Sequence, residues 1–448
     1  MAKLEKISKK KSVSRYKTII INKSKTQYQK QYQKQYQKQY QKQYQYTKKH
    51  NSSINKQKTL RIIFVYSQSL KNDAEIYANE FIKKGYKVDF KLIENINHSH
   101  SHNEKYYDVN FFLETLPFKC KIMFPSKINL FMPNNELFID TIEDNKKQSK
   151  YNRYEELKSI DFILCKTQIC YKFFTFIKTE HKKSRNYKYQ NIYTKFTSSI
   201  DDKLKVIVNS NSSLFKQDPN LFIHLAGKSG FKNTPELVLC WIKNKGFLDI
   251  DPDIKLVITC FGDCSKLLNS SLKYWHKYDF EKDPEVSINR KTHIATYKNM
   301  TIYFKPIEPL SLFTDIISSA SVSICISNKE GYGHYINESR YLKKFIITMD
   351  YPPMNELVKD KDDKDVKSGE GNGILLKKRN KFSKQTYKET KFNFYEAYPD
   401  MNELRDSIIW CIKHKNELIP YGENSRKMFL DDTKYFEDSM EKFIINKL

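Results

Sequence analysis

Long hydrophobic runs are missing from this chain of 448 residues. No apolar stretch approaches the roughly 20 residues that a membrane-spanning helix needs. The opening MAKLEKISKKK also lacks the apolar segment of a secretory signal. We therefore expect a cytoplasmic protein with no transmembrane segment.

Cysteine is present, but its spacing does not indicate a disulfide framework. The eight cysteines are scattered along the chain, and without an export signal we expect reduced thiols rather than disulfides. Cys260 and Cys264 have no second pair nearby, so their spacing favours buried thiols over a zinc site. His98, His100 and His102 also lack a carboxylate or cysteine at ligand spacing. We therefore expect no metal site.

Acidic residues are nearly absent from residues 1–58. Glu5 stands there against 17 lysines and arginines, so this tail carries +16 of the net charge of +27. From Gln27 to Tyr46 it repeats Q-Y-Q-K with a period of four and has no apolar face beyond tyrosine. A disordered tail is predicted. It is either an arm that contacts nucleic acid or another polyanion, or a repeat expansion with a solvated charge run, which we favour.

The rest of the chain alternates short apolar runs with helical stretches, and its length suggests two domains. Residues 59–207 and 221–401 are the expected domains, 209–220 a linker, and 402–448 a helical end. The expected strands of the first domain are 61–67, 87–93, 108–113, 128–131 and 161–165, with a helix over 73–84. Those of the second are 221–227, 254–261, 300–304, 321–326 and 345–349, with helices over 234–245, 309–320 and 335–342. The alternation predicts an α/β protein with two Rossmann-like, doubly wound domains.

The most informative stretch is ICISNKEGYGHYINESRYLKKFIITMDYPPMNELV (324–358). It reads as a strand, a glycine loop, a helix, a strand and a proline loop. Ligands of open α/β sheets bind outside the carboxyl ends of the strands, which is where Glu330 falls. Gly331 and Gly333 allow close backbone approach, and Glu338 lies on the following helix. Two such carboxylates can accept hydroxyl pairs at two points along one sugar nucleotide, although ordinary surface carboxylates are the alternative.

In this context the stretch resembles the E-x7-E element of retaining GT-B glycosyltransferases of family four. The resemblance implies that Glu330 contacts the hydroxyls of the donor sugar and Glu338 those of the ribose. The loop 352–356 resembles the loop that offers backbone amides near the diphosphate, which adds the donor-side candidates Met354, Asn355 and Glu356. His334 either touches the donor or has a structural role at the helix start. One departure from the family pattern is that Lys343 or Lys344 replaces the usual small glycine.

A second element, HLAGKSGFKNTPELVLCW (224–241), ends a strand at Gly227 and places Lys228 and Lys232 before a helix. Cations beside a helix start suit a diphosphate. The resemblance implies that this pair steadies the departing diphosphate, and Ser229 could add a hydroxyl donor. A Walker A loop is excluded because Phe222 stands where its first glycine must be.

Another apparent motif is Asp251-Pro252-Asp253, a D-x-D pattern like that of metal-binding glycosyltransferases. It lies in a proline turn before a strand, so we expect a simple turn.

Signals in the first domain are weaker. FMPNNELF (131–138) and DFILCKT (161–167) resemble segments that face the interdomain cleft in a subgroup of GT-B proteins. They supply the acceptor-side candidates Asn134, Asn135, Glu136, Lys166 and Thr167. The alternative is that these are loop residues that cap helices. Residues 402–448 resemble the final helices of the family, which cross back onto the first domain.

These features predict a retaining glycosyltransferase that moves a sugar from a nucleoside-diphosphate sugar to a glycan, protein or lipid, with no required cofactor or metal. Glu330, Lys228 and Lys232 are the catalytic candidates, since two lysines can offset charge on the leaving diphosphate. The resemblance implies a same-face mechanism. The rival hypotheses are a catalytically inactive GT-B core that binds nucleic acid or another polyanion through its tail, and a nucleotide-sugar epimerase of this fold.

Overall fold

The computed structural model describes residues 57–65, 67–93, 104–117, 119–134, 153–180, 186–209, 216–362, 370–378 and 397–448. Several predictions concern residues outside these ranges. They are the disordered tail up to residue 56, the candidates Asn135 and Glu136, and the histidines His98, His100 and His102.

The N-terminal lobe contains a six-stranded parallel sheet in the order β2-β1-β3-β4-β5-β6. Its strands are β1 (Thr59–Val65), β2 (Lys87–Ile93), β3 (Tyr107–Glu114), β4 (Ser126–Pro133), β5 (Phe162–Cys165) and β6 (Gln190–Tyr193). Consecutive residues Ile62 and Ile63 are both fully buried, as expected for a strand covered on both faces. The prediction contained the first five strands and missed the short, polar β6.

The helices of this lobe are α2 (Gln68–Lys83), α3 (Cys120–Met123), α5 (Arg153–Glu156), η1 (Leu157–Ser159) and α6 (Gln168–Glu180). The next helix, α8 (Asp202–Asn209), packs on the C-terminal lobe, where its Leu204 and Val208 share a core with Ile223 and Ile317. Helix α2 begins five residues before the predicted start at Asp73. The reason is a cap: the Ser67 hydroxyl accepts a hydrogen bond from the Leu70 amide at 3.2 Å, which satisfies a free donor of the first turn.

The C-terminal lobe contains an eight-stranded sheet in the order β14-β13-β12-β7-β8-β11-β10-β9. Its strands are β7 (Asp218–Gly227), β8 (Lys255–Cys260), β9 (Val286–Asn289), β10 (Ile294–Tyr297), β11 (Met300–Tyr303), β12 (Ala320–Cys325), β13 (Phe345–Met349) and β14 (Gly373–Leu376). Strands β9, β10 and β11 form an antiparallel edge, whereas the other pairs are parallel. The prediction lacked β9, β10 and β14, and β7 begins inside the expected linker.

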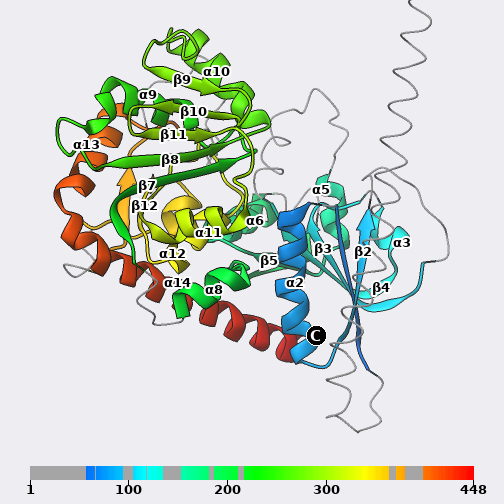
Figure 1. Ribbon diagram of the computed structural model, residues 1–448. Coiled ribbons are helices and arrows are strands. Elements are labelled where there is room, and N and C mark those ends of the chain that lie inside the picture. Colours follow the sequence, from blue (N-terminus) through cyan, green and yellow to red (C-terminus); the bar gives the residue numbers. More distant parts are fainter. Residues whose placement is uncertain are drawn as a thin grey trace, which may run out of the picture.

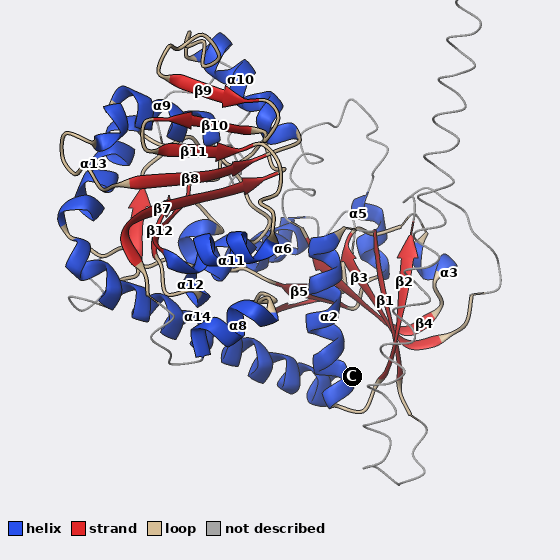
Figure 2. Ribbon diagram, in the orientation of Figure 1, coloured by secondary structure: helices blue, strands red, loops and turns tan. Residues whose placement is uncertain are grey.

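The helices of the C-terminal lobe pack on both faces of its sheet (Figure 2). They are α9 (Thr234–Lys243), η2 (Lys245–Phe247), α10 (Asp263–Trp275), α11 (Leu310–Ser319), α12 (His334–Tyr341), η3 (Met354–Glu356), α13 (Met401–Lys413) and α14 (Lys415–Lys447). No helix in the described ranges is long and apolar enough to span a bilayer.

Helix α14 joins the two lobes. It runs from the C-terminal lobe to the end of α2, where the chain ends (Figure 1). Its Phe436 packs edge-on against Tyr77 of α2 with ring centroids 5.6 Å apart, and Phe443 packs against Phe162 of β5 at 5.3 Å. One continuous apolar core therefore extends through both lobes.

Candidate functional site

The site begins at two neighbouring strand ends in the C-terminal lobe. Strands β7 and β12 are adjacent and parallel, so their carboxyl ends lie at the same edge of the sheet. The chain leaves β7 at Gly227 with φ of +56°, a left-handed conformation that favours glycine. Lys228 and Lys232 follow this turn, and Glu330 lies in the loop after β12. The topology thus places the cations and the first carboxylate together.

Lys232 and Glu330 form an ion pair across these two loops. The Lys232 ammonium also lies 3.5 Å from the centroid of the Tyr335 ring. Ser327 donates a hydrogen bond of 2.6 Å to the same Glu330 oxygen, Oε1, and the Tyr335 hydroxyl is 2.5 Å from the Ser327 hydroxyl. Glu330 is therefore fixed through Oε1, whereas Oε2 meets no partner within the described residues and remains available to a ligand.

Glu338 lies on α12, the helix that follows the glycine loop. Burial raises the pKa of its carboxyl group, and the opposing fields of His334 and Lys232 only reduce that effect. In the described part of the chain, no donor is hydrogen-bonded to this carboxylate. A ligand carrying hydroxyl groups would supply the missing donors.

Lys228 is exposed, and no carboxylate of the described segments pairs with it. Its side chain passes over Gly262, where an added Cβ would lie 3.4 Å from Lys228 Cγ. The neighbouring Ser229 hydroxyl accepts a hydrogen bond of 3.3 Å from the Phe231 amide and keeps its own proton free to donate. This loop therefore presents a cation and a hydroxyl beside the Lys232–Glu330 pair.

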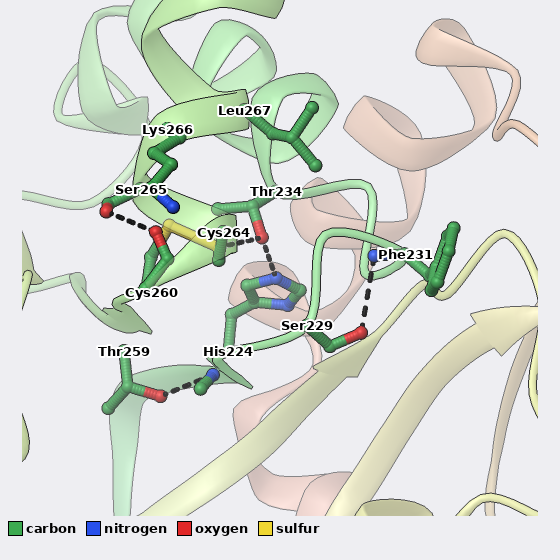
Figure 3. The surroundings of a disulfide bond; sticks show 12 residues. His224, Ser229, Phe231, Thr234, Thr259, Cys260, Cys264, Ser265, Lys266 and Leu267 are labelled. Atoms are coloured by element: carbon green, nitrogen blue, oxygen red, sulfur yellow. Dashed lines mark hydrogen bonds between the residues drawn. A yellow bond between two sulfur atoms is a disulfide. The ribbon is translucent and has the colours of Figure 1, made fainter. Parts of the chain in front are cut away.

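The expectation of reduced thiols at Cys260 and Cys264 is wrong, because the structure joins them in a disulfide (Figure 3). Cys260 ends β8 and Cys264 lies in the first turn of α10, which brings their Cα atoms to 5.2 Å, within the range that a disulfide spans. The strand-turn-helix geometry causes this approach, which the spacing alone did not reveal. The Phe261 amide between the two cysteines donates to the Gly227 carbonyl at 2.7 Å, so the disulfide borders the lysine loop. The other six cysteines are free and buried.

His334 opens α12 and faces the N-terminal lobe. Its Nε2 lies 3.2 Å from Asp73 Oδ1, and its Nδ1 lies 2.9 Å from the Ser198 hydroxyl. Asp73, on α2, also accepts a hydrogen bond of 3.1 Å from Lys166. Lys166 lies 3.8 Å from Glu114 at the end of β3. The structure therefore brings a predicted donor-side residue and a predicted acceptor-side residue into one polar cluster.

Opposite charges set the direction of the pKa shifts of Asp73 and Lys166 in this cluster, whereas burial sets that of Glu114. Burial alone would raise the pKa of Asp73, but Lys166 and His334 outweigh it and the pKa lies below its ordinary value. Burial would lower the pKa of Lys166, but Asp73 and Glu114 raise it above its ordinary value. Burial raises the pKa of Glu114, and Lys166 opposes this only in part. Asp73 and Lys166 thus form a buried, ionised pair.

The other acceptor-side candidates divide into two kinds. Thr167 caps α6, since its hydroxyl accepts a hydrogen bond of 3.2 Å from the Cys170 amide. Asn134 follows β4 and approaches the glycine loop: a Cβ added to Gly331 would lie 2.6 Å from its Oδ1. Of these two, only Asn134 faces the donor-side residues.

The loop 352–356 is held by internal contacts and by the opposite lobe. Met354 is fully buried. The side-chain amide of Asn355 donates a hydrogen bond of 3.0 Å to the Asp350 carboxylate. Glu356 accepts hydrogen bonds from the amides of Gln168 at 2.6 Å and Ile169 at 2.8 Å. Both oxygens of Glu356 therefore cap α6 in the N-terminal lobe, which is a contact between lobes rather than a free donor-side group.

Sequence reasoning did not identify Asp73, Glu114 or Ser198. Asp73 and Glu114 stand in or beside predicted elements, and no motif distinguishes them from surface carboxylates. Their ion-pair partners, Lys166 and His334, come from distant segments of the chain, so only the fold reveals these contacts. Glu114 carries one local signature, a left-handed backbone with φ of 57°, which is uncommon for residues other than glycine.

The D-x-D pattern forms a turn, as predicted. The Asp253 amide donates to Asp251 Oδ1 at 3.0 Å, and Asp251 also pairs with Lys415 of α14. Among the described residues, no three His, Cys, Asp or Glu side chains are grouped so that they could hold a metal ion.

Comparisons with known proteins identify the architecture. No family model matches the chain, and no curated protein matches it in sequence. A solved trehalose-6-phosphate synthase matches with a TM-score of 0.53 at 9% identity, over 86% of this chain and 98% of that one. Sucrose-phosphate synthase from Thermosynechococcus elongatus matches with a TM-score of 0.51 at 9% identity, over 87% of this chain and 98% of that one.

TarM is also similar, with a TM-score of 0.47 at 12% identity over 75% of this chain, but the match spans only 54% of TarM. At such low identities the likeness concerns the fold. Each lobe contains one parallel-dominated sheet, and the last helix returns to the first lobe. The chain has the twin Rossmann-like fold of the GT-B glycosyltransferases.

Proposed function

We propose that this protein is a retaining glycosyltransferase that transfers a sugar from a nucleoside-diphosphate sugar to a hydroxyl-bearing acceptor. The observation that carries the proposal is the Lys232–Glu330 ion pair at the adjoining ends of β7 and β12. It combines a cation and a carboxylate at the sheet edge where open α/β folds bind their ligands.

Each group around this pair has a place in the proposed reaction. Glu330 Oε2 and the Glu338 carboxylate accept hydroxyl groups of the sugar and the ribose. Lys228 and Lys232 lie where charge grows on the departing diphosphate, and cations already in position stabilise that charge without reorganisation. With these two cations, the proposed reaction does not require a divalent metal.

The state of Glu338 supports a ligand at this place. Burial raises the pKa of its carboxyl group, so the ionised form is unfavourable while the site is without hydroxyl donors. Hydrogen bonds from a ligand would favour the ionised form and lower that pKa.

The proposal is tested by measuring donor turnover with a panel of uridine, guanosine and adenosine diphosphate sugars. Lys228→Ala should lower the turnover rate by roughly a hundredfold, the effect of losing one preorganised charge contact. Lys255→Ala is the matched control, since Lys255 is an exposed lysine at the opposite end of the same sheet. It should behave like the wild-type protein.

Product analysis separates this proposal from its rivals. Nuclear magnetic resonance should show that the transferred sugar keeps its anomeric configuration. A donor converted to its epimer with no acceptor present would favour an epimerase. No turnover of any donor, together with polyanion binding that disappears on deletion of residues 1–58, would favour the inactive-core hypothesis.

A further inference from the structure

The loop that carries the candidate donor residues is also a contact between the lobes. Gly331 faces the Asn134 side chain. The Tyr332 hydroxyl donates to the carbonyl of Phe196, in the segment after β6. His334 contacts Asp73 and Ser198. Two residues of this loop, Gly331 and Tyr332, and the first residue of the following helix α12 therefore contact the N-terminal lobe.

Asp73 is the charged centre of this contact. Its side chain is 1% exposed, and its two oxygens divide between the lobes: Oδ2 accepts from Lys166 at 3.1 Å, and Oδ1 lies 3.2 Å from His334 Nε2. The negative charge of Asp73 favours a proton on the ring nitrogen that faces it. The Ser198 hydroxyl, 2.9 Å from Nδ1, completes the arrangement.

The His334 ring lies at the start of α12. His334 is the first residue of this helix, four residues after Glu330 and four before Glu338. The side-chain amide of Asn337 adds a second contact to this segment. It donates hydrogen bonds to the Tyr332 hydroxyl at 2.6 Å and to the Ser198 hydroxyl at 3.3 Å. The first turn of α12 thus contacts Asp73 of α2 and Ser198 of the segment after β6.

We propose that Asp73, Lys166, Ser198 and His334 form a lobe clasp in which Asp73 is a positioning residue for the donor site. The clasp aligns the helix that carries Glu338, and the loop behind Glu330, only while the two lobes are together. The catalytic role of the clasp rests on the proposed function. The contacts that form the clasp do not depend on it.

The clasp is tested with Asp73→Asn, which keeps the shape of the side chain and removes its charge. Glu80→Gln is the matched control. Glu80 is also a buried carboxylate of α2, but it pairs at 2.6 Å with Lys83 of its own helix and does not reach the C-terminal lobe. Ser198→Ala is a second variant that removes the other partner of His334 and leaves the buried charges unchanged, so it tests the clasp even if Asp73→Asn does not fold.

Hydrogen exchange of the backbone amides of 332–342 is the first measurement. Asp73→Asn should accelerate it by roughly tenfold or more, because the buried negative charge that faces His334 and pairs with Lys166 is lost. Ser198→Ala should give a smaller acceleration, and Glu80→Gln none. Unchanged exchange in both clasp variants, or an equal increase in Glu80→Gln, would overturn the proposal.

Kinetics give the second measurement. In Asp73→Asn, kcat for transfer should fall more than KM for the donor rises, because the donor contacts remain but are misaligned. A change in KM alone would overturn the positioning role. Failure of the proposed function has a different signature: the wild-type protein would turn over no sugar nucleotide, while Asp73→Asn would still accelerate exchange and so support the clasp.

Discussion

Replacement of Lys344 by methionine should stabilise the protein at neutral pH. Lys344 precedes β13 and is fully buried. Its ammonium donates one hydrogen bond, of 2.5 Å, to the Ala320 carbonyl. Methionine has a similar length and no charge to bury, so it should fill the same space.

The magnitude follows from the titration of this lysine. Burial lowers the pKa of Lys344 from 10.5 to about 7. At 1.4 kcal/mol per pKa unit, the charged form costs about 5 kcal/mol of folding free energy. Loss of the hydrogen bond to Ala320 offsets about 1 to 2 kcal/mol of this gain. A net stabilisation of about 3 kcal/mol is therefore expected at pH 7 and below.

The pH dependence has a definite sign. The pKa of Lys344 is lower in the folded state than in the unfolded state, so between about pH 7 and pH 10.5 only the unfolded chain binds this proton. Wild-type stability should rise with pH through that window. The advantage of Lys344→Met should be complete below about pH 7 and shrink towards pH 10.5.

The assay is urea unfolding of both proteins between pH 6 and pH 10. Lys343→Met is the control, because the neighbouring Lys343 is partly exposed and pairs with Glu423 at 2.7 Å. Its loss should change stability by less than about 1 kcal/mol. A destabilised Lys344→Met variant, or an advantage that does not change with pH, would refute the reasoning.

Three further predictions concern the disulfide, the donor carboxylate and the last helix. Denaturation without reductant should expose six reactive thiols, whereas eight would show that Cys260 and Cys264 are reduced. Burial raises the pKa of Glu338 above its ordinary value of 4.5, so stability falls as the pH rises from the ordinary pKa to the raised one. Glu338→Gln should therefore raise the unfolding midpoint at pH 7.5 but not at pH 4, and an equal shift at both would contradict this. Gly422→Ala would place a Cβ 2.0 Å from the Lys343 carbonyl oxygen and should destabilise the protein by about 1 to 3 kcal/mol, whereas an unchanged midpoint in urea would show that α14 can shift.

Much of the fold was predictable because its strands are strong local signals. Strands β2 and β13 were predicted at the bounds that the structure has. Strand β13 is buried along its whole length and reads as a continuous hydrophobic run, whereas β2 is an edge strand in which polar and apolar residues alternate. The short β9 and β10 form an edge hairpin of mixed polarity, and their pairing rather than their composition defines them. The start of α2 was missed because the signal is a single capping serine, Ser67.

The candidate site was predictable only where it is local in sequence. Glu330, Glu338, Lys228 and Lys232 lie in recognisable strand-loop-helix segments, and parallel pairing of β7 with β12 brings their loops together. The disulfide could not be predicted from the spacing of Cys260 and Cys264. Their approach depends on the geometry of the turn between β8 and α10, which the spacing does not determine. The partners of His334 could not be predicted either, because Asp73 and Ser198 reach it only when the lobes meet.

The most direct test of the account is calorimetric titration of the wild-type protein and Glu338→Gln with nucleoside diphosphates and their sugars. Lys255→Ala serves as the control for a surface change in the same lobe. The account predicts that one nucleotide binds the wild-type protein and Lys255→Ala alike, and binds Glu338→Gln roughly ten to a hundred times more weakly, the range for hydrogen bonds to a charged group. Equal affinity for Glu338→Gln and the wild-type protein, or no binding of any nucleotide to the wild-type protein, would contradict it.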